Sequence, residues 1–343
     1  MLTIDGSMGE GGGQLLRSSL ALSLLTSTPF RITKIRAGRA RPGLMRQHLV
    51  AVNAATEIGD AEANGAEIGS VNLTFQPKAI RAGNYKFAIS GAGSTTLVFQ
   101  TILLPLLLGS SVSSTITFEG GTHNPMAPPF EFLEHSFLPI LARMGACVEV
   151  ALSRHGFYPA GGGRWTATIL PVNELERLEL LQRGEVRSQR ATALISQLRP
   201  SIALRELDVL CNVLGWDRAS GRPQMIEQPH GPGNALLAII ESEHVTEVVT
   251  GFGERGLPAE SIAERVAAET RRYLKAGVPV GAHLADQLLL PLAFGRGGTF
   301  RTLKPTAHFT TQVELLRMFL GTKVTATEEA EDVWKVDVGA RTA

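Results

Sequence analysis

The sequence predicts a mixed α/β (α+β) protein in which three repeated βαβαβ-type units form a large domain and a small α+β domain is inserted between units two and three. Three observations support this prediction. The 343 residues are about twice the ~150 of a typical domain. Hydrophobic residues make up 44% and charged residues 19%, with 33 Lys and Arg against 32 Asp and Glu, which excludes a disordered or polyelectrolyte chain. Finally, one order of loops, helices and strands recurs along the chain.

The recurring order is a polar loop, an apolar helix, a short turn and a strand. The loops span residues 10–14, 91–96 and 283–287, the helices 15–25, 97–108 and 288–294, and the strands 30–36, 114–119 and 299–304. Each unit then continues through a Pro-containing loop into a more amphipathic helix, at 44–58, 130–144 or 311–320, and a further strand, at 71–75, 147–152 or 323–327. This order is typical of a βαβαβ-type unit that occurs three times.

The spacing between corresponding glutamines locates the insert. Gln14 and Gln100 are 86 residues apart, whereas Gln100 and Gln287 are 187 apart, so the second interval is longer by 101 residues. We therefore expect residues 1–182 and 277–343 to form the large domain and residues 183–276 the small one. The insert has its own pattern of a strand, a helix, two strands and a helix that Pro258 opens.

Cysteine content and the first residues bear on the cellular compartment. Cys147 and Cys211 cannot form a disulfide framework, and the start MLTIDGSMGE has neither the basic nor the apolar region of a signal peptide. The longest uncharged stretch, residues 87–118, is interrupted by glycines and a proline and falls short of the ~20 apolar residues that span a bilayer. These features predict a cytoplasmic protein with no membrane segment.

A basic block stands out against the nearly neutral total charge. No acidic residue lies between Glu10 and Glu57. The basic residues in this interval are Arg17, Arg31, Lys34, Arg36, Arg39, Arg41 and Arg46. A Gly- and Pro-containing loop can direct several guanidinium groups at one phosphate. The block therefore predicts a local anion site, whereas the alternative, a solvated basic face, would carry interspersed acidic partners.

Glycine-rich loops precede two of the apolar helices, at residues 11–13 and 91–94. Such loops are either tight turns or anion sites, because a helix N-terminus presents free N–H groups. Glu10 could bring Mg²⁺ to a polyphosphate or could cap the helix. His308 lies in the Pro-containing loop of the third unit and is either catalytic or structural; residues 122–125 occupy that loop in the second unit. The common nucleotide and zinc signatures are absent from the sequence.

Five blocks, in order, resemble the RNA 3′-terminal phosphate cyclase family. They are EGGGQLLR at 10–17, IRAGRARPGLMRQHL at 35–49, HGFYPAGGG at 155–163, LADQLLLP at 284–291 and the loop of His308. The resemblance runs from about residue 3 to residue 338. It implies repeats like the C-terminal domain of a translation initiation factor, together with a thioredoxin-like insert. The block at 155–163 can also be a purely structural turn between two strands.

The resemblance also implies an activity. The family uses ATP with Mg²⁺ or Mn²⁺ to convert an RNA 3′-phosphate into a 2′,3′-cyclic phosphodiester, through a histidyl-AMP enzyme and an RNA-adenylate. His308 matches the adenylated histidine and Glu10 the metal carboxylate. Gln14, Arg17, Arg36 and Arg39 match substrate-binding positions. The ATP pocket corresponds to Gln100, Pro128, His283, Leu284, Ala285, Asp286 and Gln287, with Phe252 and Glu254 of the insert as a wall. The implied partner is RNA with a 3′-phosphate end, and a homo-oligomer is compatible with the sequence.

Two positions depart from the family pattern. His283 stands where tyrosine is common, and an imidazole stacks on adenine more weakly and titrates. Gln312 stands four residues after His308, where asparagine is common, so a longer amide must make that contact. Two other functions compete with the cyclase interpretation: a non-catalytic RNA-binding relative in ribosome assembly, which should lack His308, and an enolpyruvyl-type transferase on similar repeats, which needs no ATP.

Overall fold

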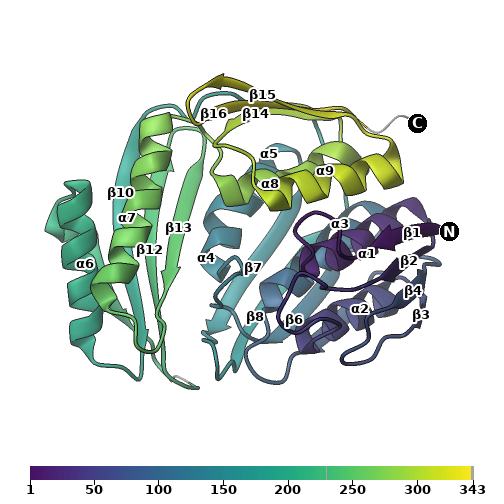
Figure 1. The fold of residues 1–343 in the computed structure, drawn as a ribbon, viewed down its shortest axis with the longest axis horizontal. Coiled ribbons are helices and arrows are strands. Elements are labelled where there is room, and N and C mark those ends of the chain that lie inside the picture. Colours follow the sequence, from purple (N-terminus) through teal and green to yellow (C-terminus); the bar gives the residue numbers. More distant parts are fainter. Residues whose placement is uncertain (229, 341–343) are drawn as a thin grey trace.

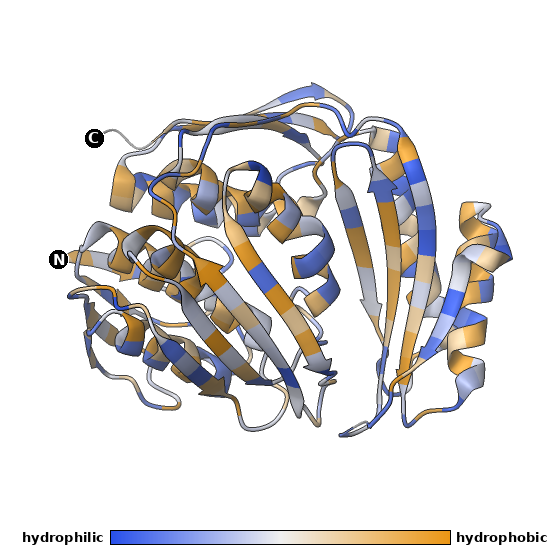
Figure 2. Ribbon diagram, turned by 180° about the vertical axis from the view of Figure 1, so that it is seen from behind, coloured by the Kyte–Doolittle hydropathy of each residue, from blue (hydrophilic) through white to orange (hydrophobic). Residues whose placement is uncertain are grey.

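Three sheets surround the helices of the three repeated units, and a fourth sheet belongs to the insert at one side (Figure 1). The computed structural model describes residues 1–228 and 230–340. The described helices of the three units pack against one another between the sheets, and their apolar side chains form one continuous core. Bands of opposite hydropathy alternate along many strands (Figure 2), as expected for sheets with one buried face.

The first unit contains β1 (Leu2–Asp5), α1 (Gly13–Thr26), β2 (Phe30–Thr33), α2 (Arg46–Ile58), β3 (Glu62–Asn64) and β4 (Leu73–Gln76). Its strand order is β1-β2-β4-β3, with β1 and β2 parallel and the other pairs antiparallel. Helix α1 forms because its leucines recur on the buried side, and it ends at Ser27, which adopts a left-handed conformation.

The second unit repeats this topology. It contains β5 (Asn84–Ala88), α3 (Thr95–Gly109), β6 (Ser114–Gly120), α4 (Phe130–Phe132), a π-helical turn (Leu133–Phe137), α5 (Leu138–Arg143), β7 (Cys147–Arg154) and β8 (Gly163–Leu170), with strand order β5-β6-β8-β7. Helix α3 is apolar on nearly all sides because it is buried on nearly all sides. Ser94 caps it by accepting a hydrogen bond from the backbone N–H of Leu97.

The third unit is divided in the sequence. It contains β9 (Leu178–Leu180), α8 (Ala282–Phe294), β14 (Gly298–Thr302), α9 (Ala307–Leu320), β15 (Val324–Ala330) and β16 (Val333–Val338), with strand order β9-β14-β16-β15. The chain between β9 and α8 forms the insert. Strand β9 nevertheless pairs in parallel with β14, as β1 pairs with β2 in the first unit.

The insert contains β10 (Val186–Ser196), α6 (Pro200–Leu214), a short 3₁₀ turn (Arg218–Ser220), β11 (Gly221–Met225), β12 (Gly233–Ser242), β13 (Thr246–Phe252) and α7 (Ala259–Ala276), with strand order β11-β10-β12-β13. Helices α6 and α7 cover one face of this sheet and share a separate apolar core with it. The other face carries Leu194, Leu237, Ile239 and Val248, which pack into the core of the repeated units. The insert is therefore joined to the large domain by an apolar interface as well as by its two linkers.

The predicted mixed α/β class with three repeated units is confirmed, and one detail changes. Each unit carries a fourth strand, β3, β8 or β16, beyond the βαβαβ pattern. Strand β11 of the insert is also additional; it contains Pro223, which an edge strand tolerates. The limits at residues 183 and 276 stay a prediction. Within the described residues, every helix is too short or too polar to cross a membrane.

Candidate active site

The N-terminal parts of three helices meet at one place, through the side chains of Gln14 on α1, Asp286 on α8 and His308 on α9. Gln14 Nε2 donates to Asp286 Oδ2 at 3.4 Å, and Gln14 Oε1 lies 2.9 Å from Nδ1 of His308. Helix N-termini carry unpaired N–H groups and the positive end of the helix dipole. Their convergence makes this region suited to bind phosphates.

His308 is held in one tautomer by Gln14. Because the Gln14 amide nitrogen donates to Asp286 Oδ2 and to Gln312 Oε1, its oxygen faces the histidine and can only accept. Nδ1 of His308 therefore carries the proton, and Nε2 keeps its lone pair. The side chain is 41% exposed, so a ligand can reach it. Burial, followed by Arg17, His283 and Arg39, lowers the pKa of His308, which keeps the ring neutral near pH 7.

Gln312, which stands where asparagine is common in the family, forms hydrogen bonds to two side chains of helix α1. Its Oε1 accepts from Ser18 Oγ at 2.6 Å and from Gln14 Nε2 at 3.5 Å. The longer amide therefore helps to orient Gln14, and through Gln14 it orients His308. The neighbouring Thr311 accepts a hydrogen bond of 3.0 Å from the backbone N–H of Glu10. Helix α9 thus positions both Glu10 and Gln14.

Glu10 lies beside His308 and does not cap α1. Its carboxylate forms an ion pair with Arg39, and its Oε2 is 3.8 Å from Nδ1 of His308. The N-cap of α1 is Gly12, which has no side chain to bond the helix. Gly9, the residue before Glu10, adopts a φ of +58°, and a side chain there would collide with Thr311. Glycine is therefore required where the chain passes close to α9. The Glu10 carboxylate is only 13% exposed and points into the site.

Arg17, which is half-buried, and His48, which is buried, form the floor of the site. Burial lowers the pKa of Arg17 to about 10, although the nearby Asp286 opposes the change, and Arg17 still carries its charge at neutral pH. Burial, followed by Arg17 and Arg36, lowers the pKa of His48 to about 3. His48 Nδ1 accepts from the backbone N–H of Met45 at 3.2 Å, so its Nε2 is the proton donor. His48 was not predicted as a site residue, although it lies within the block at 35–49.

The arginines of the loop after β2 have different neighbours. Arg36 is 9% exposed and uses Nη1 to donate to the carbonyl oxygens of Arg41 and Gly43, at 2.6 and 2.9 Å. It therefore braces its own loop, while Arg39 faces Glu10 and Arg41 is exposed. The expected convergence of the three loop arginines on one phosphate therefore stays a prediction. After burial, the charges that lower the pKa of His308 include Arg39 from this loop and Arg17 from helix α1.

The predicted nucleotide residues of α8 differ in what they can offer a ligand. Gln287 accepts from Gln100 Nε2 on α3 and donates to the backbone carbonyl of His283 at 2.9 Å, so the two glutamines connect two units. The side chains of Leu284 and Ala285 are buried in the core, and these two residues offer a ligand only their backbone. The pKa of Asp286 is raised to about 7, mainly by burial.

The insert contributes a pocket of about 260 Å³ near the start of α8. Its lining residues are Pro125, Met126, Thr250, Gly251, Phe252, Glu254, Arg265, Val266 and Glu269. Glu269 Oε1 lies 3.7 Å from Nε2 of His283, so the pocket adjoins the predicted nucleotide residues. Pro128 is nearby in the chain, and its carbonyl accepts from Thr96 Oγ1 at 2.8 Å. Phe252 and Glu254 thus line a wall beside His283, at a remove from His308.

Fold and site together define an α/β protein with a candidate phosphate site at converging helix N-termini and an accessible histidine. The family model for RNA 3'-terminal phosphate cyclase matches residues 8–326, and the chain belongs to this family. It is 49% identical over 329 residues to an RNA 3'-terminal phosphate cyclase of Koribacter versatilis, covering 96% of this chain and 92% of that protein. Similar proteins of the same name occur in Ralstonia nicotianae (48% identical, 96% of this chain and 94% of the relative) and Ectopseudomonas mendocina (46%, 98% of each).

Proposed function

We propose that this protein converts an RNA 3′-terminal phosphate into a 2′,3′-cyclic phosphodiester at the expense of ATP, with AMP carried covalently on His308. The observation that supports this proposal most is the hydrogen bond between Nδ1 of His308 and Oε1 of Gln14, because it leaves Nε2 free as a nucleophile. Membership of the cyclase family supports ATP and RNA as the substrates.

In the first step, Nε2 of His308 attacks the α-phosphorus of ATP. A P–N bond forms, the bond to the β-phosphate oxygen breaks, and its electron pair leaves with pyrophosphate. Arg17 and Arg39 are placed to stabilise the charge that develops on the phosphate oxygens, and the N-terminal turns of α1, α8 and α9 add backbone donors. The proton on Nδ1 stays on the ring, bonded to Gln14, so the adenylated histidine is a good leaving group in the next step.

In the second step, an oxygen of the RNA 3′-phosphate attacks the phosphorus of the adenylate, and the P–N bond breaks to return His308. The neighbouring 2′-OH then attacks the RNA phosphorus, loses its proton to solvent and expels AMP. Arg36 and Arg39 lie on the loop beside this histidine and are proposed to hold the RNA phosphate, with Arg36 also maintaining the shape of the loop.

The residues present also fit a divalent cation and a nucleotide. Glu10 offers one carboxylate next to the proposed phosphate position, which suits Mg²⁺ or Mn²⁺, since such ions bind one or two carboxylates together with phosphate oxygens. The cation would neutralise phosphate charge. Gln100, Gln287, His283 and Pro128 would surround the adenine, and the pocket of Phe252 and Glu254 would continue its wall. A cytoplasmic location belongs to the same proposal.

The test is incubation with α-labelled ATP and Mg²⁺, followed by a denaturing gel and acid treatment. We expect label on the protein that is lost in acid, because a P–N bond is acid-labile. His308→Ala should carry no label, whereas His244→Ala, which removes an exposed histidine of the insert, should be labelled normally. Label on His308→Ala, or an unlabelled but folded wild-type protein, would contradict the proposal. An enolpyruvyl-type transferase would release no pyrophosphate from ATP.

A further inference from the structure

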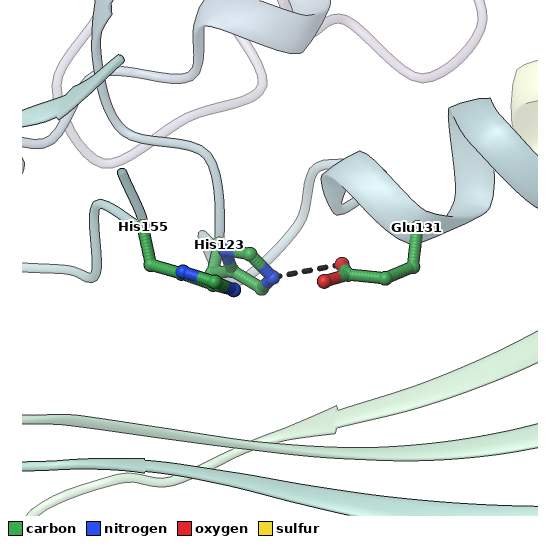
Figure 3. A group of neighbouring side chains, drawn as sticks. All are labelled: His123, Glu131 and His155. Atoms are coloured by element: carbon green, nitrogen blue, oxygen red, sulfur yellow. Dashed lines mark hydrogen bonds and ion pairs between the residues drawn. The ribbon is translucent and has the colours of Figure 1, made fainter. Parts of the chain in front are cut away.

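A second cluster of titratable side chains lies apart from the proposed active site. It consists of His123, Glu131 and His155, whose donor atoms all lie within 4.8 Å of one another (Figure 3). Nε2 of His123 is 2.8 Å from Oε2 of Glu131, and the rings of His123 and His155 are stacked with centroids 5.2 Å apart. The proposed reaction uses none of these three side chains.

The fold brings the three residues together at one edge of the second sheet. His123 follows β6 and His155 follows β7; both strands run antiparallel to β8, so their carboxyl ends lie at the same edge. An isolated parallel bridge between His123 and Phe157 holds the two loops side by side. The carbonyl of Gly156 accepts from the backbone N–H groups of Thr122 and His123. The cluster therefore rests on a hydrogen-bonded frame.

Thr122 supplies an outer partner for His123. Its Oγ1 lies 2.8 Å from Nδ1 of His123 and accepts from the backbone N–H of Gly156 at 2.8 Å. Without an ion, the hydroxyl donates to Nδ1, and Nε2–H of His123 donates to Glu131. With an ion on Nε2, the proton moves to Nδ1 and is donated to Thr122, whose own hydroxyl can turn to the Gly156 carbonyl at 3.4 Å. Metal-bound histidines usually donate their second ring N–H to an oxygen in this way.

Burial and charge also suit a bound cation. The His123 side chain is fully buried and that of Glu131 is 14% exposed. Burial would raise the pKa of Glu131, but His123, a backbone hydrogen bond and His155 together outweigh burial, and the pKa is lowered. Burial, followed by His123, lowers the pKa of His155 to about 4. A largely buried carboxylate beside two imidazoles, one of them fully buried, is a donor set that a divalent cation can satisfy.

We propose that His123, Glu131 and His155 bind one divalent transition-metal ion of the Zn²⁺ type, at a site separate from Glu10. Two imidazoles and one carboxylate suit Zn²⁺, whereas Mg²⁺ prefers oxygen ligands alone. The three donor atoms now lie within 4.8 Å of one another. They must move closer together to bind Zn²⁺, because its bonds to nitrogen are about 2.0–2.1 Å long. The ion leaves a fourth coordination position for water.

The proposed ion would stabilise the loops around the pocket of Phe252 and Glu254. His123 and Glu131 stand at the two ends of the loop that carries Pro125 and Met126, and this loop forms one side of the pocket with Phe252 and Glu254. His155 begins the HGFYPAGGG block, where Phe157 packs against Gly233 of the insert. An ion on the three side chains would therefore fix the loop, the block and the pocket wall relative to one another.

Metal binding is tested on protein freed of metal with a chelator. The background variant Glu10→Gln/His308→Ala removes the proposed active-site ligands, so that any remaining site is the new one. Zn²⁺ is titrated in competition with a chromophoric chelator, and Co²⁺ is followed by its visible absorption, which is strong for four-coordinate ions. We expect one equivalent of Zn²⁺ in the background variant and a rise in Tm on binding.

Further substitutions distinguish the cluster from other ligands. Adding His155→Ala should abolish binding, whereas adding His135→Ala, which removes the half-exposed histidine paired with Glu134, should leave one equivalent. Adding His155→Cys should keep binding and add a sulfur-to-cobalt charge-transfer band, a result that misfolding cannot produce. The proposal is overturned if the folded background variant takes up no Zn²⁺, if His155→Ala still binds one equivalent, or if His155→Cys leaves the Co²⁺ spectrum unchanged.

Discussion

Asp286 accepts a hydrogen bond from the amide of Gln14, and the opposite side of that amide accepts one from His308. The three side chains come from the N-terminal parts of three helices that belong to two repeated units, so the tautomer of the proposed nucleophile depends on how the first and third units pack. In the proposed reaction Asp286 acts indirectly, by fixing the orientation of Gln14.

Replacing Gln14 tests this relationship. Gln14→Leu removes the acceptor for Nδ1–H of His308, and we expect the rate of self-adenylation to fall about 10- to 100-fold, the effect of losing one oriented hydrogen bond. The measurement is the single-turnover appearance of acid-labile label. Gln224→Leu, an exposed glutamine on β11 of the insert, is the matched control and should adenylate at the wild-type rate. An unchanged rate in Gln14→Leu would show that Gln14 does not orient His308.

The pH profile of adenylation reports the environment of His308. Its pKa is lowered by burial and by nearby cations that include Arg39, so the ring loses its nucleophilic lone pair only when the pH falls below the ordinary histidine range. Arg39→Gln removes one cation and frees Glu10, and both changes raise the pKa of His308. We expect the acid limb of the profile to move to higher pH. Arg41→Gln, in the same loop but exposed, should leave the limb in place; a limb that moves in neither variant refutes this account.

Asp286 is expected to lower stability at alkaline pH. Its folded pKa is raised from 3.8 to about 7, mainly by burial, so the folded state binds the proton more tightly than the unfolded chain. The contribution of Asp286 to the free energy of unfolding is complete below about pH 4. It is lost progressively as the pH rises to about 7, by at most ~4 kcal/mol. Asp286→Asn should therefore be more stable than wild type at pH 8 and closer to it at pH 4.5. Urea unfolding at both pH values measures this, and an equal difference at the two would contradict it.

The two arginines of the loop should separate the steps of the proposed reaction. Arg39→Gln should depress overall cyclisation more than self-adenylation, and removing one ion pair with an RNA phosphate should reduce the log–log salt slope of RNA binding by ~0.7. Arg36→Gln should depress both steps and lower Tm, because the Arg36 guanidinium also holds the carbonyls of Arg41 and Gly43. Adenylation and cyclisation are assayed in parallel on each variant. Equal losses of both steps in Arg39→Gln would assign Arg39 to the triphosphate alone and remove it from the RNA phosphate.

Sequence patterns predicted the buried elements better than the exposed ones. The helices of the units were predictable because their apolar runs are long, as in α3. Strand β3 (Glu62–Asn64) was not, since its three residues are too few for their alternation of polar and apolar side chains to stand out in the sequence. Strand β11 has four exposed residues of five, so it owes its structure to pairing with β10.

The residues of the candidate site were likewise only partly predictable from the sequence. Residues that share a motif, such as Glu10 and Gln14, could be grouped from the sequence, but their distances to His308 depend on how α1 and α9 pack. His48 gave no separate signal, because a buried neutral histidine has no distinctive spacing. In the cluster, His123 follows β6, Glu131 lies in α4 and His155 follows β7, and the common direction of β6 and β7 brings His155 to the other two.

The position of the insert has a consequence for the order in which the protein is made. Leu178 of β9 pairs with Gly298 of β14, and a ribosome adding ~5–20 residues per second needs roughly 6–24 s to synthesise the chain between them. During that interval the first two units and the insert can form their sheets, while β9 remains unpaired because β14 has not yet been synthesised. The helix start that carries His308 emerges later still. A nascent or truncated chain ending in the insert would thus hold most of the fold and the complete His123 cluster, yet lack the residue proposed to accept AMP.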